Sequence, residues 1–198
     1  MKTPGGNHQE SGARDAIRTA AVQLFANRGF AATTTREICE QARVTKPALY
    51  YHFGSKEGLF QSLIHDAHEE CRKQMLQASH KGRSARERLV EVLAADFADT
   101  VRNPALSELF LRILFAPPSE SPGVNVVELG MQWIELFAGI LGDGVRRGEV
   151  KGKPREIAEA LLGIHLIYSM GYLLVGRPKL DRALARRIVG LVFQGCEG

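Results

Sequence analysis

The side chains between Lys46 and His52 are of the types that recognise DNA. The segment contains a lysine, two tyrosines and a histidine. A lysine donates hydrogen bonds to guanine in the major groove, whereas phenol and imidazole groups bind the phosphate backbone. Two small residues, Pro47 and Ala48, lie beside them. The segment therefore predicts a surface that reads a DNA groove.

Such a surface requires a rigid helix beneath it, and the residues that precede it predict a first short helix. Thr34 and Glu37 have the T-x-x-E spacing of a capping box, which predicts that this helix begins at about Thr35. Ile38 and Ala42 follow on one face of the helix. We expect that face to be buried.

The second short helix follows after a tight turn. Thr45 is its candidate cap, and Pro47 falls in its first turn, where the missing N–H costs nothing. Leu49 and Phe53 lie four positions apart on the side that we expect to be buried. The stretch from Thr34 to Phe53 thus predicts a helix-turn-helix whose second helix lies in the major groove.

Two longer helices are predicted around this motif. Apolar residues recur at helical spacing over 11–28, and Gly29 follows as a stop. Ser55 is the candidate cap of a helix that runs to about Ser79. We predict a disordered arm over 1–10, a DNA-binding domain over 11–56 and a helical ligand-binding and dimerisation domain over 57–198.

The stretch from about Arg14 to Phe60 resembles the DNA-binding region of the tetracycline-repressor (TetR) family. The matching motifs are LF-x-x-x-G-F, TT-x-x-I, A-x-V-[ST], LYYHF and SKEGLF, in that order, over roughly a quarter of the chain. The family usually has glycine between the Ala and Val of the turn, and this chain has Arg43. If the position is left-handed, a residue other than glycine costs about 1–2 kcal/mol, so Arg43 alters the turn or reaches a phosphate.

The resemblance implies a role for each matching position. Arg36 and Lys46 would read base edges, and Pro47 and Ala48 would make apolar contacts. The other implied DNA contacts, most of them to phosphates, are Thr35, Thr45, Tyr50, Tyr51, His52 and Lys56. It also implies a repressor that binds a palindromic operator on double-stranded DNA, forms a homodimer through its last two helices and is released by a small-molecule effector.

Composition agrees with a cytoplasmic DNA-binding protein. Residues 1–56 contain eight Lys and Arg against four Asp and Glu, whereas residues 57–198 contain eighteen of each, so the net charge of +4 lies in the DNA-binding part. The three cysteines, Cys39, Cys71 and Cys196, form no C-x-x-C pair, which favours a reducing compartment. We find no signal peptide.

The second half continues as helices, predicted over 84–102, 104–115, 124–147, 154–175 and 181–194. The fold class is therefore all-α, with about nine helices. Residues 160–176 contain no charged side chain, but His165, Tyr168, Ser169 and Tyr172 interrupt the apolar run, so we expect a buried helix and no membrane span. Candidate residues for lining an effector pocket are Phe97, Phe110, Leu114, Met131, Trp133, Phe137, His165, Tyr168 and Tyr172.

Two other functions stay open at this point. His65, His68 and Cys71 fall within one third of a helix circumference, which would suit a metal-responsive repressor, although a polar helix face is the simpler interpretation and we predict no resident metal or cofactor. An all-helical enzyme that carries a helix-turn-helix is the second alternative. The sequence has none of the common catalytic or phosphate-binding motifs, so we predict that the protein is not an enzyme.

Overall fold

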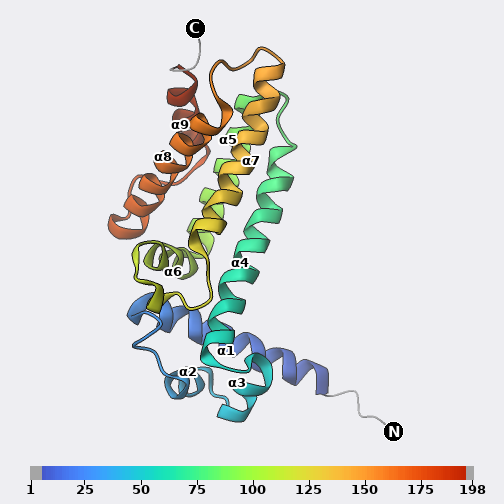
Figure 1. Cartoon of the computed structure of the whole chain (residues 1–198). Helices are drawn as coiled ribbons and strands as arrows, with labels where there is room; N and C mark the ends of the chain where they lie inside the picture. The colour runs from blue at the N-terminus through green and yellow to red at the C-terminus, as the bar shows by residue number, and fades with distance from the viewer. Residues whose placement is uncertain (1–5, 195–198) are drawn as a thin grey trace. The chain divides into compact units, whose positions relative to one another are not determined.

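The structure, a computed structural model, describes residues 6–194 and the side chains of residues 12–194. In this part of the chain it is all-α, with nine α-helices and one short 3-10 helix (Figure 1). The helices are α1 Gly6–Arg28, α2 Thr35–Ala42, α3 Lys46–Phe53, α4 Lys56–Ser79, α5 Ala85–Arg102, α6 Pro104–Phe115, α7 Val126–Arg146, α8 Pro154–Val175 and α9 Arg182–Gln194, with η1 at Pro118–Glu120. The predicted fold class is confirmed.

The predicted helix ends agree with these bounds except at the start of the chain. Helix α1 begins at Gly6, so residues 6–10, which the sequence pattern assigns to an arm, belong to this helix. No proline lies between Gly6 and Arg28, and a single internal glycine, Gly12, costs only about 1 kcal/mol in a helix. Residues 1–5 and Cys196 lie outside the described residues.

The chain forms two compact units. The first comprises the residues up to Ala67 together with Ala105–Asn125, and the second comprises His68–Pro104 and the residues from Val126 onward. The first unit is therefore larger than the predicted DNA-binding domain, because it also contains half of α4, most of α6 and the turn after α6.

Three phenylalanines form the centre of the first unit. Phe25 from α1, Phe60 from α4 and Phe30 from the intervening turn pack with ring centroids 5.1–5.7 Å apart. Ile38 of α2 and Leu49 of α3 are fully buried. The helix-turn-helix is therefore fixed to α1 and α4 by a dry apolar core.

The segment 105–125 is fastened to α1 within this first unit by polar contacts. Arg112 of α6 donates from Nε to the carbonyl of Ala26 at 3.0 Å and from Nη2 to that of Asn27 at 3.3 Å, so it binds carbonyls in the last turn of α1. Glu120 accepts a hydrogen bond from the amide of Ala31 at 3.3 Å. Gly29 allows this approach, because a Cβ there would lie 2.5 Å from Glu120 Oε2.

The second unit has its own core between α5, α7, α8 and α9. The largest fully buried side chains are Phe97 of α5 and Phe137 of α7, and the core continues through Leu89, Leu93, Leu141, Leu161, Ala185 and Ile188. The side chain of Arg88 joins three helices at one end of the unit, because it donates to the Ser79 carbonyl and to the Asp143 carboxylate, each at 2.7 Å.

Helix α8 is the one described helix that is long and apolar enough to cross a membrane, judged by length and composition. Its buried residues, however, include two polar ones, His165 and Ser169, which face other side chains of the second unit. Only 22% of its apolar stretch is buried inside the structure, so the expectation of a buried helix holds for the face with His165 and Ser169 and not for the rest of the helix.

Candidate functional site

The predicted start of the helix-turn-helix is confirmed in atomic detail. Thr34 Oγ1 accepts a hydrogen bond from the amide of Glu37 at 3.2 Å, and the Glu37 side chain accepts one from the amide of Thr34 at 2.9 Å. This reciprocal pair satisfies two of the free amides at the start of α2. The hydrogen bond from the Thr34 amide is the main cause that lowers the pKa of the Glu37 carboxyl.

The turn between α2 and α3 depends on Arg43. This residue has φ 55° and ψ 42°, and in the described part of the chain it is the sole residue other than glycine with positive φ. Its amide donates to carbonyls of Cys39 and Glu40, which closes the end of α2. The chain therefore keeps the left-handed turn that glycine usually provides in the family. The side chain of Arg43 is exposed beside α3.

Helix α3 presents most of the predicted DNA contacts to solvent. Leu49 is fully buried, whereas Tyr50 and Tyr51 are 48% and 75% exposed. Lys46, Pro47 and Thr45 are also exposed, and Ala48 and His52 are half-buried. Thr45 lies at the N-cap of α3, but its side chain makes no capping hydrogen bond. One short helix thus carries a cation, two phenols and an imidazole on its outer side.

Helix α2 contributes Arg36 and Thr35 to the same unit. The guanidinium of Arg36 lies 2.7 Å from the Glu40 carboxylate, four positions later on α2, and its side chain is 76% exposed. A solvent-exposed ion pair of this kind contributes little to stability, so Arg36 can leave Glu40 for a stronger acceptor. Thr35 is half-buried in the first turn of α2.

Lys56 is used differently from the other predicted contacts. Its ammonium donates to the carbonyls of Phe30 and Thr33, at 3.0 and 2.9 Å, and lies 4.1 Å from the centroid of the Phe30 ring. These contacts hold the turn before α2 against the start of α4. Two of the three N–H donors of Lys56 are therefore engaged within the protein.

Helix α4 begins directly after α3, through Gly54 and Ser55. Ser55 Oγ accepts a hydrogen bond from the amide of Gly58 at 2.9 Å, which confirms Ser55 as the cap of α4. Gly58 passes so close to α3 that a Cβ there would lie 2.3 Å from the carbonyl oxygen of Phe53. The angle between α3 and α4 is thereby set by a backbone contact.

The residues predicted to line an effector pocket are divided between the two units. Phe110 and Leu114 belong to the first. The others belong to the second, where Phe97 and Phe137 are buried, Met131 is exposed, and Trp133, Tyr168 and Tyr172 pack partly buried against the core.

His165 lies at the centre of a buried polar cluster in the second unit. Its Nε2 is hydrogen-bonded to the carboxylate of Asp96 from α5, and Ser169 Oγ lies 3.4 Å from the same nitrogen. The thiol of Cys71 donates to the other oxygen of Asp96 at 3.6 Å. The imidazole also stacks on Phe97 and Trp133, with centroids 5.4 and 6.4 Å away.

Asp96 was not among the predicted site residues, although the sequence contains a signal for it. The residue interrupts the apolar stripe formed by Leu89, Leu93 and Phe97, at a position that must face the core. A carboxylate in such a position needs buried donors, and His165 and Cys71 provide them.

Two of the three candidate metal ligands, His68 and Cys71, have other partners within the second unit, and His65 is exposed in the first unit. Nε2 of His68 lies 3.0 Å from Oε1 of Gln132, and Cys71 bonds to Asp96. Among the described residues, no group of three or more His, Cys, Asp or Glu could hold a metal ion. The cluster around Asp96 therefore has hydrogen-bonding rather than metal-binding geometry.

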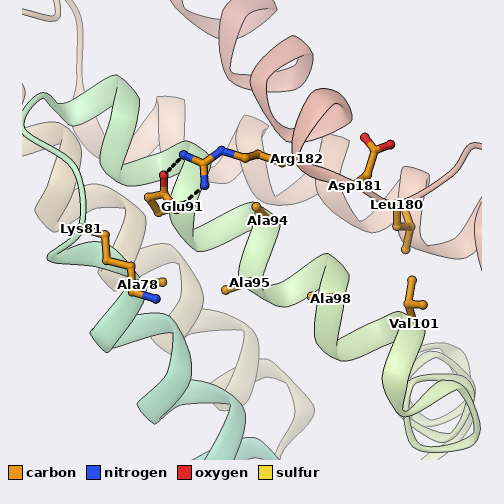
Figure 2. Close-up of a pocket in the computed structure, with 10 residues that line it drawn as sticks. All are labelled: Ala78, Lys81, Glu91, Ala94, Ala95, Ala98, Val101, Leu180, Asp181 and Arg182. Atoms are coloured by element: carbon orange, nitrogen blue, oxygen red, sulfur yellow. Dashed lines mark hydrogen bonds and ion pairs between the residues drawn. The ribbon is translucent and has the colours of Figure 1, made fainter.

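A separate open groove of about 540 Å³ runs along the surface of α5 (Figure 2). Its floor consists of small α5 side chains, and a paired Glu91 and Arg182 lie at one end. The lining residues are Ala78, Lys81, Glu91, Ala94, Ala95, Ala98, Val101, Leu180, Asp181 and Arg182, and none of them is a predicted pocket residue.

Comparison with known proteins agrees with this geometry. Residues 17–63 match the model of bacterial regulatory proteins of the tetR family. The chain is 32% identical over 190 residues to the HTH-type transcriptional repressor BepR of Brucella suis, which covers 91% of this chain and 90% of that protein. The chain belongs to the TetR family. Like its relatives in this family, it is a DNA-binding transcription regulator.

The chain is also similar to another repressor and to solved structures. KstR2 of Rhodococcus jostii, also an HTH-type transcriptional repressor, is 24% identical over 72% of this chain and 70% of its own length. Among solved structures, FadR of Bacillus subtilis in complex with stearoyl-CoA has a TM-score of 0.79 at 21% identity, covering 92% of this chain and 99% of that one. FadR of Bacillus halodurans has a TM-score of 0.81 at 18% identity, covering 100% of this chain and 98% of its own. These two structures share the fold.

Proposed function

We propose that the protein is a cytoplasmic repressor that binds a palindromic operator as a homodimer and leaves it when a small molecule binds the second unit. The single observation that carries this proposal is helix α3, which exposes Lys46, Tyr50 and Tyr51 while Leu49 anchors it in the core. Several relatives are named as repressors.

Within this proposal, Lys46 and Arg36 read base edges, because both are exposed and can reach guanine O6 and N7. Pro47 and Ala48 make apolar contacts. Thr35, Thr45, Tyr50, Tyr51 and His52 bind phosphates and set the register. Lys56 acts mainly as a support of this surface, since its ammonium is engaged by two carbonyls.

The homodimer would form through α8 and α9. Ile167, Leu174 and Val175 of α8 are 61–72% exposed and Leu191 of α9 is 55% exposed, which is unfavourable for side chains of this size unless another surface covers them. A second copy of the same two helices would complete a four-helix bundle. Two reading helices about one DNA turn apart would then fit a palindrome.

The effector would act by a coupling free energy between its site and the DNA-binding surface, typically about 1–3 kcal/mol. Helix α4 contains residues of both units and is the natural connection between the two sites. The solved complex of Bacillus subtilis FadR with stearoyl-CoA supports a small-molecule site in a chain of this fold.

The test uses an operator that the full-length protein selects from random DNA. Lys46→Ala should weaken binding to this operator by about 1–3 kcal/mol and change binding to random DNA much less. Lys179→Ala removes another exposed lysine, in the second unit, and should change the affinity for neither operator nor random DNA. Equal losses on operator and random DNA for Lys46→Ala would reject the assignment, and a protein that stays monomeric would reject the palindrome.

A further inference from the structure

The polar cluster around His165 has one atom whose hydrogen bonding is incomplete. The imidazole is 7% exposed, and its Nδ1 makes no hydrogen bond with any part of the chain that the structure describes. A buried polar atom without a hydrogen bond destabilises the protein. A ligand that supplies the missing hydrogen bond would relieve this destabilisation.

The hydrogen bond at Nε2 determines whether Nδ1 can accept or donate a hydrogen bond. Nε2 is bonded to the carboxylate of Asp96, and a carboxylate only accepts, so the proton of the neutral imidazole resides on Nε2. Nδ1 then carries a lone pair. The group that completes the cluster is therefore a hydrogen-bond donor.

The charge around the cluster favours a positively charged donor. Asp96 is 8% exposed, and its described partners are an imidazole and a thiol. Burial raises the pKa of the neighbouring Cys71 thiol, and the negative charges of Asp96, Asp99 and Glu70 raise it further. A cation at Nδ1 would be attracted by the Asp96 carboxylate across the imidazole, whereas an anion would be repelled.

The apolar surroundings of the cluster suit the rest of such a molecule. Phe97 and Trp133 stack on the imidazole, and aromatic faces attract both apolar groups and cations. Phe97 is fully buried, whereas Trp133 is only partly buried. The apolar part of a ligand would therefore contact Trp133 rather than Phe97.

We propose that the effector of this repressor is an amphipathic amine. Its protonated nitrogen donates to Nδ1 of His165, across the imidazole from the carboxylate of Asp96, and its apolar part packs against Trp133. This inference rests on the proposed function, because it names the ligand class that the second unit would sense.

The chain has a single tryptophan, Trp133, which reports directly on this site. Its fluorescence is followed while the full-length protein is titrated with decylamine, decanol, sodium decanoate or decyltrimethylammonium, each below its aggregation concentration. We expect decylamine to bind at least about tenfold more tightly than the other three, which lack either the charge or the N–H donor. Equal or tighter binding of decanoate or decanol would overturn the proposal.

Two substitutions then locate the amine. His165→Phe keeps an aromatic ring but removes both nitrogens, and Asp96→Asn keeps the shape of the carboxylate but removes its charge. Each should reduce decylamine affinity by about tenfold or more and leave decanol affinity nearly unchanged. Glu91→Gln, which removes a carboxylate elsewhere on α5, is the matched control and should bind decylamine normally.

If either variant does not fold, the selectivity of the wild-type protein among the four probes still decides the matter. Normal decylamine binding by both folded variants would overturn the proposal. Operator binding, measured separately without any probe, tests the proposed function. A protein that binds its operator but shows no preference for decylamine refutes this inference alone.

Discussion

The ammonium group of Lys56 lies 3.0 Å from the carbonyl oxygen of Phe30 and 4.1 Å from the centroid of the ring of the same residue. A single side chain thus binds the backbone and the aromatic face of the turn that precedes the helix-turn-helix. Because the Phe30 ring also packs on Phe25 and Phe60, Lys56 connects the start of α4 to the centre of the first unit.

Replacing Lys56 with methionine should therefore reduce stability. Hydrogen bonds from a charged donor contribute about 1.5–3 kcal/mol, so we expect the free energy of unfolding to fall by about 2 kcal/mol in urea denaturation. The control is Lys46→Met, which alters an exposed lysine of α3 and should leave stability unchanged. A Lys56→Met protein as stable as the wild type would contradict this role.

Arg43 gives a second prediction, because it holds a left-handed conformation without being glycine. Arg43→Gly should raise the free energy of unfolding by about 1 kcal/mol through relief of this strain. Arg43→Ala keeps the strain and removes the charge, so it should show no such gain. If both variants lose the same affinity for DNA at low salt, the guanidinium contacts a phosphate.

Gly58 gives a third prediction, through its contact with α3. Gly58→Ala would place a Cβ 2.3 Å from the Phe53 carbonyl oxygen, so α3 or α4 must shift, at a cost of about 1–3 kcal/mol in thermal unfolding. Gly130→Ala on α7 meets no atom within 4 Å and should instead be neutral or stabilising by up to about 1 kcal/mol. Equal melting temperatures for the two variants would show that the contact is unimportant.

The capping box predicts a dependence of stability on pH. The pKa of Glu37 is lowered in the folded protein, chiefly by the hydrogen bond from the Thr34 amide, from an ordinary value of 4.5. The stabilisation of the fold by the ionised Glu37 carboxylate is therefore complete above pH 4.5, and it is lost as the pH falls through the lowered pKa. Wild type should be more stable than Glu37→Gln at neutral pH, and the two should converge in acid. A constant difference between pH 7 and pH 3 would contradict this mechanism.

Much of the fold follows from local signals in the sequence. Thr34 and Glu37, only three residues apart, determine where α2 begins. The helical spacing of apolar residues, together with the glycines and prolines that end a helix, predicts most other helix ends. The exposed side of α3 follows in the same way, because Leu49 must be buried and its neighbours then face outward.

The remaining features depend on partners that are distant in the sequence. The carbonyls that bind Lys56 lie 23 and 26 residues before it, and Asp96 is 69 residues from His165. From the sequence alone, a lysine near a helix start could equally well bind a phosphate. Only the folded chain places the carbonyls of Phe30 and Thr33 next to Lys56. The assignment of Phe110 and Leu114 to the first unit likewise depends on contacts that α6 makes with residues distant in the sequence.

The bond from Arg112 to Ala26 spans 86 positions of the chain. The compact unit that contains α3 is therefore discontinuous in sequence, and a fragment that ends near residue 56 would lose the side chain that binds the last carbonyls of α1. A chimera that grafts this specificity onto another regulator should carry residues 105–125 together with the first 67, because the two stretches form one folding unit.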